Sequence, residues 1–304
     1  MKAAGPIGSV VEAENGRIKA SAGYRSGRYE FAAGASALIL MNRVAFFDER
    51  ASKLDDEGQR ALLRWAVERA LGQNGKLLGQ VAARRDAALT ELRRRGLSVA
   101  RFAAEPEWRL AVGLGNKANP HEIGLSLHGT YGCPVIPGTS LKGLAAAWAV
   151  ASGADHDDIR RVLGTPRRDL PAPASELKDP DSGNNARLPQ AARGTVCFLD
   201  AIPLRGRVDV QLDVLTPHVK PYYSAVAGGE AVLVPPAEYH NPVPVNFLTV
   251  RGAFAVDLYG AAEADVNLAA RWLSEAASEL GAGGKTAAGY GYLVMKELPR
   301  KGSR

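Results

Sequence analysis

Hydrophobic positions recur at helical spacing in the first third of the chain. Residues Asp55 to Gly96 are mostly good helix formers, and the segment Gly72 to Gly75 divides them into two predicted helices. In the second helix an apolar stripe faces one way and basic residues point largely elsewhere. The stripe consists of Leu78, Val81, Leu89 and Leu92, and the basic residues are Arg84, Arg93, Arg94 and Arg95. Two interpretations stay open for these arginines, a solvated helix face and a contact to nucleic acid.

The segments before these helices differ in pattern. Residues 1–36 are rich in Gly, Ala and Ser with short apolar patches, which predicts a flexible or extended arm. The stretch Ala37–Phe47 is compact and apolar, which predicts burial, although periodicity does not separate helix from strand there. We therefore expect residues 37–107 to form a helical N-terminal elaboration that packs on a core beginning at residue 108.

Strand and helix patterns alternate in the rest of the chain. The predicted strands are Trp108–Gly115, Gly194–Ile202, Val208–Leu215, Asn246–Leu258 with a break at Arg251–Gly252, and Tyr290–Glu297. The second and third are expected to form a hairpin with a turn at Leu204–Gly206. Helices are predicted from Leu141 to about Ala151, capped by Thr139 or Ser140, and up to Leu280, ended by Gly281.

This order of elements predicts an α+β fold with a ferredoxin-like βαββαβ core over residues 108–297. A doubly wound sheet fits less well, because short turns and not crossover helices join the middle strands. The segment 165–189 contains five prolines and a polar run, so residues 165–193 are predicted to be a mobile insertion. Residues 298–304 are predicted to be a loose basic tail.

Composition and charge narrow the function classes. An apolar fraction of 46% and a charged fraction of 23% are typical of a folded soluble protein. The two cysteines, Cys133 and Cys197, are too far apart in sequence for a zinc knuckle or a redox pair. No apolar run approaches the roughly 18 residues that a membrane span needs, which predicts a cytoplasmic protein. A net charge of +6 and a pI near 9.3 favour polyanionic partners.

Two loops carry residues suited to phosphate. The first, Tyr131–Gly143, leads from a Pro/Gly turn into a helix start, where backbone N–H groups and the helix dipole attract anions. Thr139 and Ser140 add hydroxyl donors to it, and Lys142 adds a full charge. An ordinary capped helix with a solvated lysine explains the same residues equally well.

The second loop, Gly281–Gly291, contains five glycines and Lys285 between the last helix and the last strand. Glycines permit positive φ angles, so that successive N–H groups can form an anion-binding concavity. Gly284-Lys285-Thr286 matches the end of a nucleotide-binding P-loop, but the first glycine of that motif falls on Glu279. A P-loop also leads from a strand into a helix, which is the opposite order. We therefore do not expect nucleotide hydrolysis.

Other catalytic motifs are weak. His121-Glu122 lacks the second histidine of a zinc-protease helix, because position 125 is leucine. The run Asp155–Asp158 resembles a metal cluster but is more typical of a solvated helix start. No Gly-x-Ser-x-Gly elbow is present.

Taken together, these motifs resemble the RAMP superfamily of CRISPR systems. The resemblance covers about Arg109 to Leu293 and includes the two loops and the intervening Phe198–Ala201, Asp213–His218 and Tyr222-Tyr223. Gly113–Gly115, Pro120–Gly124 and the run Ile136–Gly143 are similar to the sixth-subunit family of type III-B (Cmr) effector complexes. The N-terminal third matches only in kind.

The resemblance implies a function in RNA-guided antiviral defence. Proteins of this family have a ferredoxin-like fold close to RNA-recognition modules, bind the backbone of the guide RNA, and close one end of a helical stack of subunits. The expected partners are guide RNA, with target RNA as a further candidate, other RAMP subunits of the Cmr complex and its small helical subunit, and no membrane. Another subunit cuts the target, so no catalytic residue, metal or cofactor is expected here.

The resemblance also implies RNA-facing residues in both loops. These are Thr139, Ser140, Lys142 and Gly143 in the first, and Gly283, Gly284, Lys285 and Thr286 in the second. Tyr290 is expected either to stack on a base or to pack in the core, with packing slightly favoured. His218, Tyr222 and Tyr223 match the family motif, and whether they contact RNA or brace the insertion stays open. The central expectation is that Lys142 and Lys285 lie along one groove lined with main-chain amides.

Two rival functions remain open. One is an endoribonuclease that processes guide RNA, with His156 or His218 as general base. The other is a scaffold subunit whose main contacts are to proteins, with the basic charge incidental.

Overall fold

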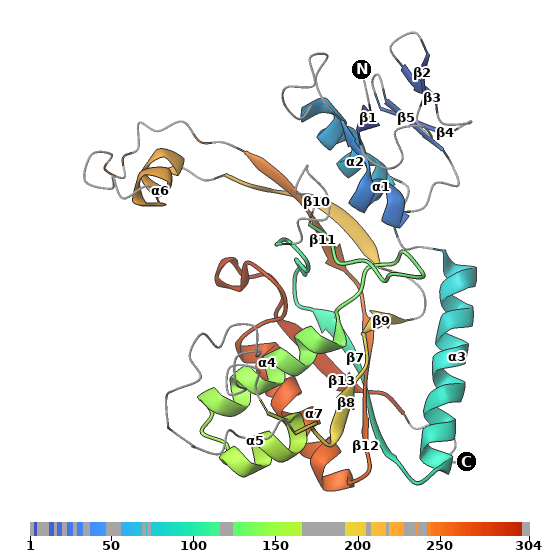
Figure 1. Cartoon of the computed structure of the whole chain (residues 1–304), viewed down its shortest axis with the longest axis vertical. Helices are drawn as coiled ribbons and strands as arrows, with labels where there is room; N and C mark the ends of the chain where they lie inside the picture. Colours follow the sequence, from blue (N-terminus) through green and yellow to red (C-terminus); the bar gives the residue numbers. More distant parts are fainter. Residues whose placement is uncertain are drawn as a thin grey trace, which may run out of the picture. The chain divides into compact units, whose positions relative to one another are not determined.

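A computed structural model gives the fold of the chain (Figure 1). The residues that the structure describes are 3–4, 12–14, 17–19, 23–26, 29–32, 37–46, 56–68, 71, 74–115, 124–165, 192–204, 208–216, 219–227, 235, 237, 242 and 244–299. The chain divides into two compact units that each combine distant segments. Unit 1 comprises residues 1–73, 111–134 and 208–251, and unit 2 comprises residues 74–110, 135–207 and 252–304.

Unit 2 is built on an antiparallel sheet with the strand order β13-β7-β12-β8, and β9 also pairs with β12. Its strands are β7 (Ser98–Pro106), β8 (Val196–Phe198), β9 (Ile202–Pro203), β12 (Phe254–Gly260) and β13 (Leu293–Glu297). Its helices are α3 (Gly75–Arg94), α4 (Gly138–Ala151), α5 (His156–Leu163) and α7 (Glu263–Glu279), and a 3-10 turn spans Thr286–Ala288.

Helices cover both faces of this sheet. Helix α7 packs on β7, β12 and β13 and against α4 and α5, while α3 runs along the opposite face (Figure 1). The central strand β12 therefore has buried residues pointing in both directions, as expected for a strand covered on both sides. The α7 residues that face the core recur every three or four positions. They are Val266, Ala269, Ala270, Leu273, Ala276 and Ala277.

Unit 1 contains a buried apolar segment, a long hairpin and short strands. Helix α1 (Ala37–Arg43) and strand β6 (Ala45–Phe46) are followed by α2 (Asp56–Glu68). The hairpin pairs β10 (Asp209–Leu215) with β11 (Val245–Arg251) in antiparallel register, and α6 (Lys220–Ala227) lies in the connection between them. Short strands β1 (Ala3–Ala4), β2 (Glu12–Glu14), β3 (Arg17–Lys19), β4 (Gly23–Ser26) and β5 (Tyr29–Ala32) occur in the predicted arm.

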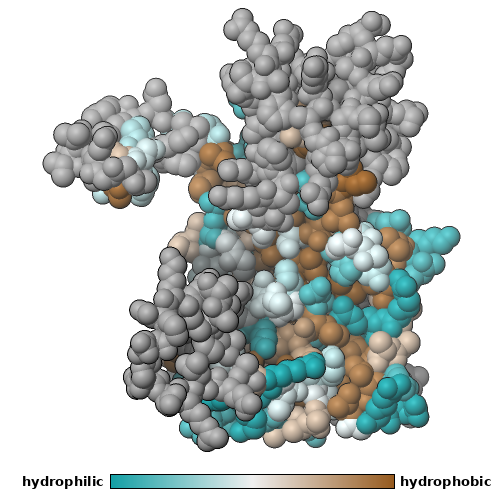
Figure 2. Space-filling view, viewed as in Figure 1, coloured by the Kyte–Doolittle hydropathy of each residue, from teal (hydrophilic) through white to brown (hydrophobic). Residues whose placement is uncertain are grey.

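The hairpin exposes apolar side chains. Leu212, Val214 and Val245 are large and exposed, and hydrophobic surface is visible on the hairpin in Figure 2. Exposed apolar groups on a protruding element are typical of a surface that binds a partner.

Several predicted elements are confirmed. The α+β class with an antiparallel sheet is present, and the break at Arg251–Gly252 separates β11 from β12. The two helices of residues 56–94 are also present, and Asn74 caps the second by accepting a hydrogen bond from the N–H of Leu77. The described part of the apolar stretch, residues 37–46, is divided between a helix and a strand and is largely buried, but Ile39 is exposed.

Other predictions were wrong. The strand expected at Trp108–Gly115 lies earlier, at Ser98–Pro106, so the boundary expected at residue 108 falls inside unit 2. The expected hairpin between Gly194–Ile202 and Val208–Leu215 does not form, because β8 and β9 pair with β12 while β10 pairs with β11.

Among the described residues, no helix is both long and apolar enough to cross a membrane.

Candidate nucleic-acid interface

The first predicted loop ends in a close contact between backbones. A Cβ atom added to Gly138 would lie 2.4 Å from the carbonyl oxygen of Phe198, so only glycine fits where α4 begins. The helix starts at Gly138 with Pro137 in the cap position, and no side chain caps it from there. The predicted cap by Thr139 or Ser140 was therefore wrong, because both residues already lie within the first turn.

A carboxylate from another segment takes the capping role. The N–H of Gly138 donates a hydrogen bond of 2.7 Å to Oδ1 of Asp200. The carboxylate thus faces the positive end of the α4 dipole, where the sequence left both a phosphate site and an ordinary helix cap open. Asp200 is exposed, so the start of α4 remains at the surface.

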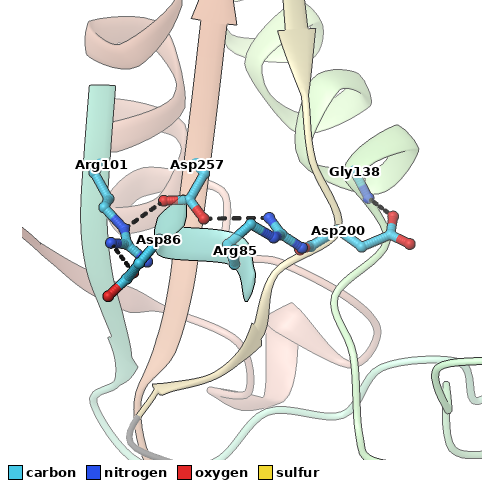
Figure 3. Close-up of polar contacts among 6 residues, drawn as sticks. All are labelled: Arg85, Asp86, Arg101, Gly138, Asp200 and Asp257. Atoms are coloured by element: carbon cyan, nitrogen blue, oxygen red, sulfur yellow. Dashed lines mark hydrogen bonds and ion pairs between the residues drawn. The ribbon is translucent and has the colours of Figure 1, made fainter. Parts of the chain in front are cut away.

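Asp200 also belongs to a larger polar network (Figure 3). Its backbone carbonyl accepts a hydrogen bond of 3.0 Å from Arg85, and Arg85 reaches Asp257 at 3.2 Å. Arg101 donates to the other oxygen of Asp257 at 2.8 Å and also pairs with Asp86. Burial raises the pKa of Asp257, whose side chain is inaccessible, and the two guanidinium groups oppose that shift. The network ties α3, β7 and β12 to the entry of α4.

The candidate residues of the first loop are accessible to different degrees. Thr139 and Ser140 are exposed in the first turn of α4, and Gly143 is exposed in the second. Lys142 is half-buried in the same turn. The residues that carry the two hydroxyl groups, Thr139 and Ser140, are therefore more accessible to a ligand than Lys142 is.

The second loop has the positive φ angles that its glycines predicted. The backbone is left-handed at Gly281, Gly283, Gly289 and Gly291, with φ between 73° and 88°. Lys285 also has a positive φ, of 60°, and among the described residues no other non-glycine does. A side-chain-bearing residue in this conformation is uncommon and costs of order 1 kcal/mol, so the surrounding loop must hold it there.

Internal hydrogen bonds close the loop on itself. The N–H of Ala282 donates to Gly291 at 2.7 Å, and the N–H groups of Ala288 and Tyr290 both donate to the carbonyl of Lys285. Gly291 is required by the close approach, since a Cβ there would lie 1.9 Å from the carbonyl oxygen of Ala282. The loop is therefore a folded turn and not an open chain.

Two amides of this turn make no backbone hydrogen bond to a described residue. Gly283 is exposed and Gly284 is half-buried, and the N–H of neither donates to a backbone carbonyl of a described residue. Together with Lys285 and Thr286, both half-buried, they form a short run of donors beside a positive charge. Runs of backbone donors beside a positive charge are a known way to bind anions, so an anion site at this turn stays a prediction.

An aromatic pair lies beside the second loop. Tyr290 is only 5% exposed and its ring centroid lies 4.8 Å from that of Trp108, with 39° between the planes. Of the two interpretations of Tyr290, packing is the one that this geometry fits, because a buried ring cannot stack on a base. Trp108 is 44% exposed, and the guanidinium carbon of Arg109 lies 5.2 Å from its ring centroid. Trp108 was not among the predicted site residues, because the pattern around it predicted a strand at Trp108–Gly115.

The two loops are anchored on opposite edges of the same sheet. Ile136 forms a bridge with Ala201, next to β9 at one edge, and the second loop leads directly into β13 at the other. With three strand spacings between the edges, the anchor points are roughly 14 Å apart across the sheet. The second loop and residues 135–143 of the first belong to unit 2. Whether Lys142 and Lys285 share one groove stays a prediction.

The remaining candidates separate clearly. The side chain of Asp155 accepts hydrogen bonds from the N–H groups of Asp157 and Asp158, so this acidic run is the start of α5. Within the described ranges, no three His, Cys, Asp or Glu side chains gather as metal ligands.

His156 is exposed at the first position of α5, and Tyr223 is exposed on α6 with its ring edge-on to Tyr222. His218 and the His121-Glu122 pair lie outside the described residues.

Comparison with known proteins adds to this geometry. The family model of the RAMP superfamily matches residues 109–294. The chain is 29% identical over 228 residues to the CRISPR system Cmr subunit Cmr6 of Pyrococcus furiosus, an alignment that covers 61% of this chain. The chain thus spans 65% of the length of that relative.

One solved structure shares the fold of this chain. A chain of the type III-B Cmr-beta complex bound to cognate target RNA superposes with a TM-score of 0.56 at 18% identity, covering 80% of this chain and 74% of that chain. The crystal structure of Cmr6 from Pyrococcus furiosus has a TM-score of 0.36 at 27% identity, covering 66% of this chain and 98% of that chain.

Proposed function

The chain belongs to the RAMP superfamily, and from this premise we propose that it is a non-catalytic, guide-RNA-binding end subunit of a type III-B CRISPR effector complex. The named relative is a Cmr subunit, and the superposed chain comes from a Cmr complex that holds target RNA. These names support a role in antiviral RNA-guided defence.

The observation that carries the proposal is the geometry of the Gly281–Gly291 loop. Two amides that make no backbone hydrogen bond to a described residue, the hydroxyl of Thr286 and the charge of Lys285 lie on one turn that internal hydrogen bonds hold in shape. Donors fixed before the ligand arrives bind it with a smaller loss of entropy. Backbone amides and a lysine contact phosphates without reading base edges, as a subunit that must accept many RNA sequences requires.

The sheet supports a ferredoxin-like core. The four strands, numbered first to fourth along the chain, are β7, β8, β12 and β13. Across the sheet they lie in the order β13-β7-β12-β8, which is fourth, first, third, second. Helices α4 and α5 follow β7, and α7 follows β12, on one face (Figure 1). We assign this arrangement to the βαββαβ plan shared with RNA-recognition modules, with β10, α6 and β11 inserted before the third strand.

The first loop takes a second role in this proposal. Thr139, Ser140 and Gly143 offer exposed polar groups near Lys142, but Asp200 neutralises part of the positive end of α4. We therefore assign the main phosphate contact to the second loop and a weaker one to the first. His218 is kept as a further candidate RNA contact on the sequence motif alone.

Protein partners fit a different surface. The exposed apolar residues of the β10–β11 hairpin suit contact with the other RAMP subunits and the small helical subunit of the complex. In this proposal the main RNA contacts come from unit 2, and the apolar hairpin of unit 1 binds protein.

The full chain and a fluorescein-labelled single-stranded RNA test the proposal. Anisotropy titrations at several salt concentrations should give an affinity that falls linearly in a log–log plot, because phosphate contacts release counterions. Co-expression with Cmr partner subunits should recover the chain in an RNA-containing particle. A wild-type chain that shows no salt-dependent RNA affinity contradicts the proposal.

The same preparation tests the endoribonuclease. Incubation with repeat RNA in chelator should leave the RNA intact. Cleavage at a defined site that disappears in His156→Ala or His218→Ala would establish an enzyme instead. Assembly with the partners in the absence of any RNA affinity would establish the protein scaffold.

A further inference from the structure

We propose that Trp108 is a base-stacking residue that works with the Gly281–Gly291 loop, so that the loop holds a phosphate of single-stranded RNA and the indole stacks on a neighbouring base. The inference rests on the proposed RNA-binding function. It identifies where an unpaired base lies on this chain and replaces Tyr290 in that role.

Backbone hydrogen bonds fix Trp108 against the second loop. The N–H of Glu107 donates to Tyr292 at 2.9 Å, and the carbonyl of Arg109 accepts from Gly291 at 2.8 Å. Trp108 therefore sits between two bonds to the end of the loop. The N–H of Tyr290 in turn donates to Lys285 at 3.3 Å, so the indole and the lysine belong to one hydrogen-bonded structure.

The indole is both supported and accessible. Tyr290, buried itself, lies against the Trp108 ring at 4.8 Å and limits how the indole can turn. Even so, 44% of Trp108 remains exposed, which is unusual for the largest apolar side chain. A ring that is already ordered loses little conformational freedom when a base stacks on it.

The charge around the ring suits a nucleotide. The Arg109 guanidinium lies 5.2 Å from the centroid of Trp108, and Lys285 stands on the adjoining loop. Aromatic rings flanked by basic groups along a path for the backbone are the usual means of holding single strands. Because every base has a π-face, such a contact accepts any sequence.

Binding to two oligonucleotides separates stacking from phosphate contact. Trp108→Ala should weaken binding of a single-stranded RNA about 5- to 150-fold without changing the salt dependence. It should leave the affinity for an oligomer of the same length with abasic positions throughout unchanged. Trp108→Phe keeps a stacking ring and should retain most of the affinity, which also controls for loss of packing on Tyr290.

Fluorescence gives an independent readout with a matched control. Trp65 and Trp272 are each 4% exposed and Trp148 is half-buried, so Trp108 is the most exposed of the four tryptophans. Addition of poly(U) should quench the emission of the wild-type chain. The quench should persist in Trp148→Phe and disappear in Trp108→Phe.

The outcomes distinguish this inference from the proposed function. Wild-type affinity in Trp108→Ala, or a quench that survives Trp108→Phe, overturns base stacking while a weakened Lys285→Ala still supports RNA binding. Loss of partner subunits from Trp108→Ala with RNA affinity unchanged also overturns it and assigns the indole to a protein interface. A wild-type chain that binds no RNA refutes both.

Discussion

The carboxylate of Asp200 accepts a hydrogen bond of 2.7 Å from the backbone N–H of Gly138, the first residue of α4. The helix start therefore already has an anionic partner from the β8–β9 segment. This relationship separates two roles that the sequence alone leaves open for the loop, an ordinary capped helix and a phosphate grip. The hydrogen bond shows that the start of α4 is capped, and a phosphate that binds there must compete with the carboxylate of Asp200.

Substitutions at Asp200 measure that competition. Asp200→Ala should lower the free energy of unfolding by about 0.5–2 kcal/mol, as for the loss of a helix cap. Asp200→Asn keeps an accepting oxygen and loses only the charge, so it should cost less, about 0.3–1 kcal/mol. Denaturant titration checks both values.

The same variants report on RNA. If phosphate approaches the first turn of α4, Asp200→Asn should raise RNA affinity about two- to five-fold at low salt, the equivalent of the lost repulsion. An affinity equal to that of the wild type would remove Thr139, Ser140 and Lys142 from the interface and leave the second loop alone.

The two lysines should differ in importance. Lys285→Ala should reduce the steepness of the log–log salt dependence by about 0.7, the value for one phosphate contact to a single strand, and lower affinity for all sequences alike. Lys142→Ala should have a smaller effect, because Lys142 lies beside a helix start whose N–H already binds the carboxylate of Asp200. Lys296→Ala removes the same charge from the exposed surface of β13 and serves as the control. Equal effects of all three substitutions would mean that only net charge matters.

The shape of the second loop can be tested at two matched glycines. Gly289 and Gly291 have nearly the same φ, 88° and 83°, so replacing either with alanine carries a similar backbone strain. A Cβ at Gly289 meets no atom within 4 Å, whereas one at Gly291 would lie 1.9 Å from the carbonyl oxygen of Ala282. Gly291→Ala should therefore lower both the melting temperature and RNA affinity more than Gly289→Ala. Equal losses would show that the contact with Ala282 does not shape the loop.

The sequence predicted local features better than strand partners. Helix boundaries at residues 56–94 and the break at Arg251–Gly252 depend on nearby helix formers and glycines, and these predictions are confirmed. The expected hairpin after Gly194 was wrong because pairing depends on residues more than 30 positions away. Val208–Leu215 alternates in the same way whether its partner is β9 or β11, so periodicity could not choose between them.

In the candidate site, too, local features were predicted better than contacts between distant residues. Glycine content predicted the left-handed backbone of the second loop, a property that each residue carries by itself. The Asp200 cap and the Trp108–Tyr290 pair join residues 62 and 182 positions apart, and no local pattern indicates them. The one local signal for Trp108 was that a tryptophan and the basic Arg109 stand side by side at the start of the predicted strand.

The two cysteines should react at very different rates. Cys133 is 1% exposed, and burial raises the pKa of its thiol to about 11, so only about one molecule in a thousand carries the reactive thiolate at pH 8. Cys197 is half-exposed. An Ellman titration of the native chain should show one prompt thiol at pH 8 and two after denaturation. Cys197→Ser should abolish the prompt reaction, and a prompt reaction that survives it would mean that the segment around Cys133 opens readily.

The buried carboxylate of Asp257 should contribute more to stability than its partner Asp86. Asp257 is inaccessible and binds both Arg85 and Arg101, whereas the side chain of Asp86 is 26% exposed. Asp257→Ala leaves two guanidinium groups facing a buried gap and should lower the free energy of unfolding by about 3–5 kcal/mol. Asp86→Ala leaves Arg101 its bond to Asp257 and should cost about 1 kcal/mol or less. Because Arg85 also holds the carbonyl of Asp200, Asp257→Ala should additionally weaken RNA binding through the start of α4, an effect that Asp86→Ala should not share. Similar losses of stability in the two variants would contradict the greater weight of the buried carboxylate, and unchanged RNA affinity in Asp257→Ala would show that the network does not act on the start of α4.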